Sequence, residues 1–373
     1  MLKSLHVSNF TVFADARFEF SPGLNVLVGT NGTGKTHVLK LGYAVEFARE
    51  QMKNADSSKL PLGLQISENR WIAELFYNLP QVFQTASFEN LGANNSTHQI
   101  TSAKIEFLDS YSLDKLTEPE ALIFEIDPDA SGIRIKGGGE VTSHKIPAFA
   151  PVFIPAKELL TLSWMLPASE QLALPVERNY LDLLTQLRGL PRRQPASPAS
   201  IAVLTQLLGG EVKEEGDKYY LTQADGRRLE VSMVAEGLRK FGMLQKLLIN
   251  GSLTPQTTLY WDEPEANLNP ALLRELARVL AELARQGFQI ILATHSMSLL
   301  KQFHILSREP HGQPLPIRYF GLNAEPGQAT VIHTVDDFEL LPHVVALEVE
   351  LAQADDLEEI FAREDRLPDA ANR

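Results

Sequence analysis

The 373-residue chain contains no cysteine. Disulfide frameworks, cysteine-ligated zinc sites and thiol nucleophiles are therefore excluded. Long hydrophobic runs are also missing, because no apolar stretch approaches the roughly 20 residues that a membrane-spanning helix needs. The amino terminus, residues 1–7, alternates like a strand and has no apolar segment of the secretory kind. We therefore expect a cytoplasmic protein with no membrane contact.

Positive charge is also in short supply. Lys and Arg number 34 against 47 Asp and Glu, which gives a formal net charge of −13. This balance excludes a uniformly basic nucleic-acid coat but leaves a local basic groove open. The basic residues that could line such a groove are Arg188, Arg192, Arg193, Arg227 and Arg228. Exposed arginines in polar loops are usually just solvated, so contact with DNA stays open as one alternative.

The first 155 residues combine strand patterns with one long helical stretch. Short strands are predicted at 2–7 and 24–28, followed by a glycine-rich turn and a helix from residue 35 to about 51. Residues 52–100 are polar, and we expect loops there with one or two helices. Strand-like runs then alternate with Asp-Pro, Ser-Gly and Gly-Gly-Gly turns between residues 105 and 155.

The second half changes character twice. Residues 158–188 have a helical pattern, residues 189–199 form a proline-rich linker, and residues 218–231 predict a hairpin that turns at Asp225-Gly226. Between residues 235 and 303 the order is helix, strand, helix, strand, helix, which is typical of a parallel α/β sheet. The acidic last thirty-odd residues predict an amphipathic helix packed on the body. With 44% hydrophobic residues, the chain can bury a sizeable core.

The strongest motif is the segment from Gly29 to Thr36, which fits the pattern G-x-x-x-x-G-K-[ST] in full. It follows a predicted buried strand and opens a predicted helix, which is the context that a phosphate-binding loop requires. The alternative is a glycine-rich turn that matches by chance. Lys35 would reach the β- and γ-phosphates, and the Thr36 hydroxyl would ligate Mg²⁺. The nucleotide-binding residues that we infer are Gly29, Asn31, Gly32, Thr33, Gly34, Lys35, Thr36 and His37.

Two acidic residues, Asp262 and Glu263, end an apolar run that begins at Thr258. An acid at the carboxyl end of a parallel strand faces the ligand crevice beside the phosphate loop. We expect Asp262 to share the Mg²⁺ ion with Thr36, and Glu263 to orient and activate the attacking water. The alternative is an Asp-Glu-Pro turn that could follow any strand.

A histidine, His295, ends the next buried run, residues 290–294. A lone histidine is more often a core or capping residue than a ligand. Here the neighbouring strand delivers it to the same sheet edge as Glu263, so we predict a contact with the γ-phosphate. The catalytic residues that we expect are Glu263, Lys35 and His295.

Together these segments resemble an ABC-type ATPase. The resemblance is to the soluble branch that contains RecF, SMC proteins and OLD-family ATPases, often labelled AAA-type ATP-binding proteins. It is strong over the first fifty residues and about 232–300. The implied fold is an α/β P-loop NTPase with an ABC-ATPase-like parallel sheet, an antiparallel β lobe and a helical insertion. The implied cofactors are ATP and Mg²⁺.

The resemblance also implies elements that act between two subunits. A signature motif acting in trans is expected at Ala235, Glu236 and Gly237, with Ala235 where the family has a serine. The D-loop position is taken by Ala266, Asn267, Leu268 and Asn269. The segment where the family carries its Q-loop, residues 153–158, contains no glutamine. A magnesium-sensing role cannot be transferred to that segment.

The chain departs from several members of the branch. The insertion between Lys35 and Asp262 is too short for the coiled coil of an SMC protein and lacks heptads. Only 78 residues follow His295, and no strand-ending acidic constellation of a Toprim nuclease is found there. We therefore expect neither an SMC arm nor nuclease activity. We also do not expect the chain to be the ATPase subunit of a membrane transporter.

These inferences predict a head-to-tail homodimer, or a higher homo-oligomer, that closes around ATP and reopens on hydrolysis. Such a switch would control a separate effector, a nuclease or toxin, in bacterial antiviral defence. One alternative is a RecF-like DNA repair or recombination ATPase, and another is an ATP-bound scaffold that does not hydrolyse.

The motifs also divide the chain into expected parts. The amino-terminal ATPase lobe with the phosphate loop takes residues 1–50 plus 101–157, with a polar insertion at 51–100. A helical insertion with the proline-rich linker and hairpin follows at 158–230. The carboxy-terminal ATPase lobe, with the signature, the acidic strand end and the histidine, takes 231–335. An acidic helical tail ends the chain at 336–373.

Overall fold

A computed structural model of the chain describes residues 1–54, 69–85, 88–92, 101–107, 121–127, 132–135, 150–172, 174–309 and 313–364. Several features predicted from the sequence lie outside the described residues. They are the Gly-Gly-Gly turn at 137–139, the tail beyond residue 364, and much of the polar insertion.

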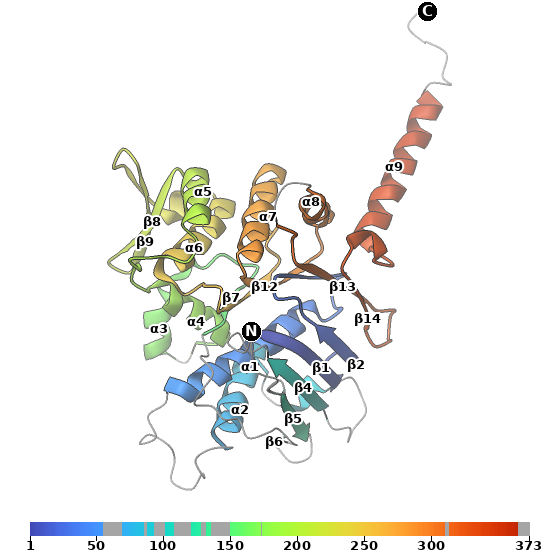
Figure 1. The fold of residues 1–373 in the computed structure, drawn as a ribbon, viewed down its shortest axis with the longest axis horizontal. Helices are drawn as coiled ribbons and strands as arrows, with labels where there is room; N and C mark the ends of the chain where they lie inside the picture. Colours follow the sequence, from blue (N-terminus) through green and yellow to red (C-terminus); the bar gives the residue numbers. More distant parts are fainter. Residues whose placement is uncertain are drawn as a thin grey trace, which may run out of the picture.

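A six-stranded sheet forms the centre of the molecule, in the order β14-β13-β3-β12-β11-β7 (Figure 1). The strands β13, β3, β12, β11 and β7 run parallel, and β14 is antiparallel to β13. Their bounds are β3 (Leu24–Gly29), β7 (Val152–Ile154), β11 (Thr258–Asp262), β12 (Gln289–Thr294), β13 (Ile317–Asn323) and β14 (Val331–Val335). The predicted parallel α/β sheet is confirmed, with the strand before the phosphate loop near its middle.

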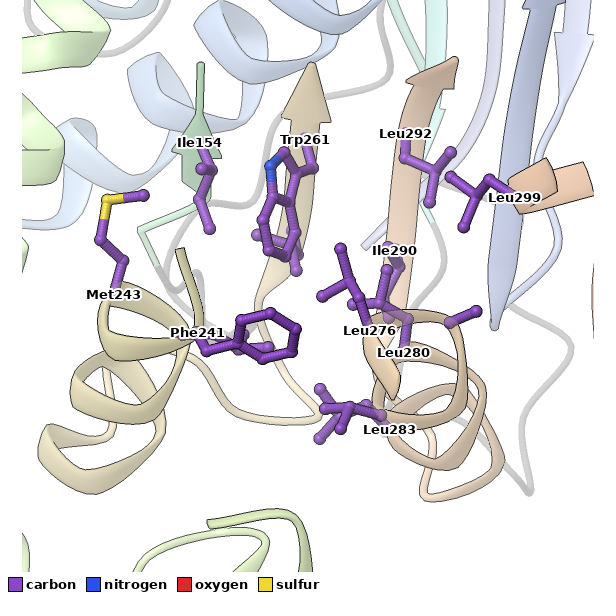
Figure 2. Packing of buried hydrophobic residues seen from close by; sticks show 14 of the residues in the cluster. Ile154, Phe241, Met243, Trp261, Leu276, Leu280, Leu283, Ile290, Leu292 and Leu299 are labelled. Carbon is purple, nitrogen blue, oxygen red and sulfur yellow. The ribbon is translucent and has the colours of Figure 1, made fainter. Parts of the chain in front are cut away.

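Both faces of the sheet are covered, which explains why its strands are apolar at successive positions. Successive side chains point to opposite faces, so Leu259 and Trp261 of β11 join one buried cluster while Tyr260 joins the other. Figure 2 shows Trp261 on the same side of the sheet as Phe241 and Leu276. The helices that cover that side include α6 (Glu236–Asn250), α7 (Pro270–Arg285) and α8 (Met297–Arg308), and α1 (Lys35–Asn54) covers the other.

A second, antiparallel sheet packs over α1 in the order β2-β1-β4-β5-β6 (Figure 1). Its strands are β1 (Leu2–Phe10), β2 (Phe13–Glu19), β4 (Thr101–Phe107), β5 (Ala121–Asp127) and β6 (Gly132–Ile135). Strand β2 was missing from the sequence prediction, although Phe13, Ala16 and Phe18 are its buried residues. The helix α2 (Asn69–Phe83) and the short turn η2 (Phe88–Leu91) are described parts of the polar insertion. The predicted antiparallel β lobe is confirmed.

The expected helical stretch 158–188 is broken into η4 (Leu160–Leu162), α3 (Met165–Gln171) and α4 (Arg178–Leu187). Pro175 lies just before α4, where a residue without an N–H cannot continue a helix. The linker leads to α5 (Pro198–Leu208).

A three-stranded sheet, in the order β10-β9-β8, follows α5. Its strands are β8 (Gly210–Glu215), β9 (Lys218–Gln223) and β10 (Arg228–Glu230). The predicted turn at Asp225-Gly226 joins β9 to β10, with Gly226 at a φ of 84°. Strand β8 was not predicted. Short 3-10 turns, η5 (Val231–Met233) and η6 (Phe338–Leu340), precede α6 and α9.

The acidic tail forms the helix α9 (Val345–Glu364), which projects away from the body (Figure 1). None of its residues is buried, and Leu351 and Phe361 are 57% and 58% exposed. The expectation that this helix packs on the body is therefore wrong. Only its base is attached, where Ala346 and Leu347 touch the core and Glu350 pairs with Lys301 of α8. Among the described helices, none combines the length and apolar character that a membrane crossing requires.

Candidate nucleotide-binding site

The phosphate loop joins the end of β3 to the start of α1, as its sequence context predicts. Gly32 and Gly34 take φ values of 84° and 89°, a left-handed conformation that glycine adopts without a Cβ penalty. A Cβ on Gly34 would lie only 2.6 Å from side-chain atoms of Val12 and Phe13. Both the curl of the loop and its approach to the antiparallel sheet therefore require glycine at position 34.

The ammonium group of Lys35 lies inside the curl of this loop. The residue is 6% exposed, and its Nζ donates hydrogen bonds of 2.8 Å to the carbonyls of Gly29 and Thr30. Burial lowers the pKa of Lys35, and the nearby carboxylates of Asp262 and Glu263 oppose that shift. The loop thus holds a preformed positive charge where its amides converge.

The first residues of α1 meet the end of β11. Thr36 Oγ1 donates a hydrogen bond of 2.9 Å to Asp262 Oδ2, across a separation of 226 residues. Burial raises the pKa of Asp262, whereas the hydrogen bond from Thr36 lowers it. A hydroxyl and a carboxylate at hydrogen-bond distance are the oxygen donors that Mg²⁺ prefers, so this pair fits a magnesium ion.

Glu263 and His295 lie side by side at the same sheet edge. Glu263 has a φ of 45°. Its backbone amide donates a hydrogen bond of 3.0 Å to the carbonyl of Ala293, which anchors the turn to β12. Its Oε1 lies 3.6 Å from Nδ1 of His295. The structure thus brings these two side chains together at one sheet edge, where the sequence analysis expected them.

Glu265 supports this pair, a part that the sequence prediction left out. Its Oε1 accepts hydrogen bonds from Thr294 Oγ1 at 2.6 Å and from the amide of His295 at 3.0 Å. The side chain is 9% exposed. Because Glu265 holds the backbone of His295, it fixes where the histidine stands relative to Glu263.

The expected signature and D-loop segments touch each other within one chain. Asn267 Nδ2 donates a hydrogen bond of 2.8 Å to Glu236 Oε1. A Cβ on Gly237 would lie 2.7 Å from the carbonyl oxygen of Asn267. Backbone bonds from Ala266 and Leu268 to the carbonyls of Glu263 and Glu265 form the turn between them. Asn269 then caps α7 by accepting from the Leu272 amide. The signature end of α6 therefore rests on the turn that carries Glu263.

Replacing Ala235 by serine tests the start of α6. Ala235 is the N-cap, has a ψ of 136°, and makes no side-chain capping bond. A serine hydroxyl there would accept a bond from a first-turn amide, so we expect Ala235→Ser to stabilise the protein by about 1 kcal/mol. Urea unfolding measures this, with Ala235→Val as the control that supplies no acceptor. An unchanged unfolding midpoint in Ala235→Ser would contradict the capping argument.

The loop after β7 faces the signature segment and contains a buried acid, Glu158. Its side chain is 2% exposed and accepts from Arg239 Nη1 at 3.3 Å. Arg239 also donates to the carbonyls of Val234 and Ser232. The absence of a glutamine here is thus accompanied by an ion pair that ties this loop to α6.

Two further contacts carry charge near the site and were not predicted. Lys240 is fully buried, and its Nζ lies 3.2 Å from the carbonyl of Glu263. Lys40, one turn after Thr36 on α1, pairs with Glu177 at 2.9 Å. The signal for Lys240 was a charged residue on the otherwise apolar face of α6.

The side chain of His37 does not join the cluster. Its ring centroid lies 5.8 Å from that of Phe83 on α2, and burial lowers its pKa. Only its backbone amide is left to face a nucleotide.

A groove of about 660 Å³ opens beside the phosphate loop. One wall is the stretch Gly29, Thr30 and Asn31 together with His295, and the other is the base of α9. The groove therefore places the tail next to the candidate site.

Three of the five arginines considered for a nucleic-acid path are paired with carboxylates. Arg188 pairs with Asp217 at 2.6 Å, Arg227 pairs with Asp225 at 2.5 Å, and Arg228 pairs with Glu215. Arg192 lies against Gly251. These ion pairs favour the solvated-surface interpretation of the arginines over a basic groove.

The central sheet and the phosphate loop define a P-loop NTPase fold. The chain belongs to the family described as "AAA domain, putative AbiEii toxin, Type IV TA system", whose model matches residues 24–301. A second family model, described as "AAA domain", matches residues 4–41. The resemblance to an AAA-type ATP-binding protein, inferred from the motifs, is confirmed.

Sequence relatives match over short stretches. The DNA replication and repair protein RecF of Pediococcus pentosaceus is 42% identical over 55 residues, which is 15% of each chain. RecF of Clostridioides difficile is 35% identical over 75 residues, or 20% of this chain and 19% of that protein. The chain thus spans less than a fifth of the length of these relatives.

Solved structures match over nearly the whole chain. An SMC head bound to the C-winged helix domain of ScpA superposes with a TM-score of 0.56 at 12% identity, covering 91% of this chain and 98% of that one. An SMC head with an extended coiled coil, bound to the C-terminal domain of ScpA derived from Pyrococcus furiosus, gives 0.53 at 12% identity, covering 96% and 99%. At this identity the likeness shows the fold, and the predicted fold class is confirmed.

Proposed function

We propose that this protein hydrolyses ATP to ADP and phosphate with Mg²⁺, and that ATP closes two copies into a dimer. The observation that carries the proposal is the bond between Thr36 and Asp262 beside the buried Lys35, because these groups are the donors and the cation that MgATP needs. Lys35 and the loop amides would bind the phosphates. Magnesium, held by Thr36 and Asp262, would supply charge neutralisation.

Hydrolysis in this proposal relies on the pair formed by Glu263 and His295. Glu263 orients a water and accepts its proton as the water oxygen bonds to the γ-phosphorus, and the bond from that phosphorus to the ADP oxygen breaks. His295 stands 3.6 Å from Glu263, where it can donate to the γ-phosphate oxygens. Phosphoryl transfer demands mainly positioning and charge neutralisation, which this cluster supplies.

The dimer follows from the composition of the site. In one chain, the expected signature residues Ala235, Glu236 and Gly237 rest on their own D-loop rather than on their own phosphate loop. A head-to-tail partner would bring its Gly237 and the amides of its α6 N-terminus to the γ-phosphate. Each site would then be complete only in the dimer.

We propose that the dimer controls a separate effector, a nuclease or toxin, in antiviral defence. The family description names a toxin and a type IV toxin–antitoxin system, which supports this setting. The SMC heads that share the fold are bound to ScpA in their structures, which supports a protein partner. The alternative of a RecF-like repair ATPase is favoured by the RecF matches, and the ion pairs of Arg188, Arg227 and Arg228 speak against it.

The test is ATP turnover by the purified protein with and without duplex DNA, together with its mass in solution. We expect slow turnover that needs Mg²⁺ and is indifferent to DNA, and a mass near twice 41.4 kDa with ATP. Turnover stimulated by DNA would support the repair alternative. Turnover no faster than that of a Glu263→Gln variant would support the scaffold alternative and overturn the proposal.

A further inference from the structure

Lys240 places a buried cation under the turn that carries Glu263. The residue lies in the first half of α6, and none of its surface is exposed. Its Nζ donates to the carbonyls of Glu263 at 3.2 Å and Pro264 at 3.4 Å. A buried ammonium is costly unless it is well paired, so this placement needs an explanation beyond packing.

The turn above Lys240 has an unusual backbone. Glu263 has a φ of 45°, a conformation that non-glycine residues seldom adopt. Its amide is bonded to Ala293 and its carbonyl accepts from Ala266 and from Lys240. The carbonyl of Pro264 takes its hydrogen bond from Lys240. The ammonium is therefore a clamp on two consecutive carbonyls in a strained turn.

The carboxylates around Lys240 face it from two elements. Glu265, Glu263 and Asp262 lie at the end of β11 and in its turn, and Glu236 lies on α6 itself. All four attract the ammonium, while burial opposes its charge and lowers the pKa of Lys240 to about 8. The carboxylates at the end of β11 thus help to keep Lys240 positively charged at neutral pH.

We propose that Lys240 is a positioning residue for hydrolysis, which holds the Glu263 turn so that the carboxylate meets the attacking water. This inference rests on the proposed ATPase function. Because Lys240 is three residues from Gly237, the clamp also joins the signature end of α6 to the site of its own chain. Movement of α6 when a partner binds would then be felt directly at Glu263.

The first test compares Lys240→Met with Lys246→Met. Methionine keeps most of the chain length and removes the ammonium. Lys246 is the matched control, since it is also largely buried on α6 but pairs with Glu214 at 3.9 Å, away from the site. We expect Lys240→Met to lower kcat about tenfold to a hundredfold with the KM for ATP within about twofold, and Lys246→Met to keep the wild-type kcat. Wild-type kcat in Lys240→Met would overturn the inference.

The second test is the pH profile of kcat at saturating MgATP. We expect the kcat of wild type and of Lys246→Met to fall as pH rises through about 8, as Lys240 loses its proton. In Lys240→Met the part of this fall that is due to Lys240 should be missing. Any change caused by Lys35 is common to all three proteins. The same decline in Lys240→Met as in wild type would contradict the inference, since a merely structural loss leaves the profile unchanged.

The third test uses the protein without nucleotide, so that it does not depend on activity. Amide hydrogen exchange measured by mass spectrometry reports the turn between residues 262 and 269. We expect amide exchange in this segment to be about tenfold faster in Lys240→Met than in wild type, and to keep the wild-type rate in Lys246→Met. Exchange in β12 should be unchanged in both variants. Unaltered exchange in the turn would overturn the inference. If the wild-type protein shows no turnover, the proposed function fails and the inference fails with it. If the wild type turns over and only the Lys240→Met results disagree, the inference alone fails.

Discussion

Lys35→Ala is expected to abolish detectable ATP binding. The side chain provides the one ammonium seated inside the phosphate loop, where it already bonds to two loop carbonyls. Removing a charged hydrogen-bond donor to phosphate weakens the binding free energy by about 3 kcal/mol, so the affinity for ATP should fall about a hundredfold or more. Isothermal titration calorimetry with ATP and Mg²⁺ measures this. Loss of the buried cation should also leave the fold intact, because methyl replaces a group that burial disfavours.

The control for this variant is Lys218→Ala, which removes an exposed lysine paired with Glu230 on the three-stranded sheet. It lowers the net positive charge by the same amount and should bind ATP like wild type. Unchanged affinity in Lys35→Ala would show that the segment from Gly29 to Thr36 is not the phosphate site. Circular dichroism of each variant separates lost binding from lost folding.

Glu263→Gln is expected to keep ATP binding, lower kcat about 10² to 10³-fold, and trap the ATP-bound dimer. Glutamine has nearly the same shape but cannot accept the proton of the attacking water. The Glu263 side chain is also 34% exposed, and its backbone, not its carboxylate, makes the hydrogen bonds of the turn, so stability should change little. Turnover assays and mass in solution with ATP measure the two effects.

Glu275→Gln is the matched control for this substitution, on the exposed side of α7 where Glu275 pairs with Arg278. It removes one carboxylate outside the site and should leave both turnover and mass unchanged. A Glu263→Gln protein that turns over at the wild-type rate would exclude this carboxylate as the base. A variant that loses turnover but stays monomeric with ATP would contradict the closed dimer.

The sequence was most informative where local pattern and motif agree. The segment from Gly29 to Thr36 specifies its own turn, because glycine takes the left-handed conformation at 32 and 34 without a Cβ penalty. The apolar runs before Asp262 and His295 are long enough and sufficiently continuous to indicate buried parallel strands. The approach of Glu263 to His295 could be predicted because parallel strands end at one edge of the sheet.

Side-chain contacts between distant segments could not be predicted. Lys240 was hidden because its partners are backbone carbonyls 23 and 24 residues away, and carbonyls leave no mark in a sequence. The pair formed by Glu158 and Arg239 depends on how the loop after β7 meets α6. Strands β2 and β8 were missed because charged residues interrupt their apolar pattern, with Asp15, Arg17 and Glu19 in β2 and three glutamates and a lysine in β8. The roles of the site residues, and the division into domains, stay predictions.

The projecting helix α9 has a mechanical consequence. Its 20 residues make a rod about 30 Å long. The base of this rod, from Val345 to Val349, lines the groove beside Gly29 and Asn31, while its far end touches no other element that the structure describes. A tilt of about 10° at the base would move the tip by about 5 Å. A small rearrangement at the phosphate loop that tilts the base of α9 would therefore displace the tip of this helix by several times the movement at its base.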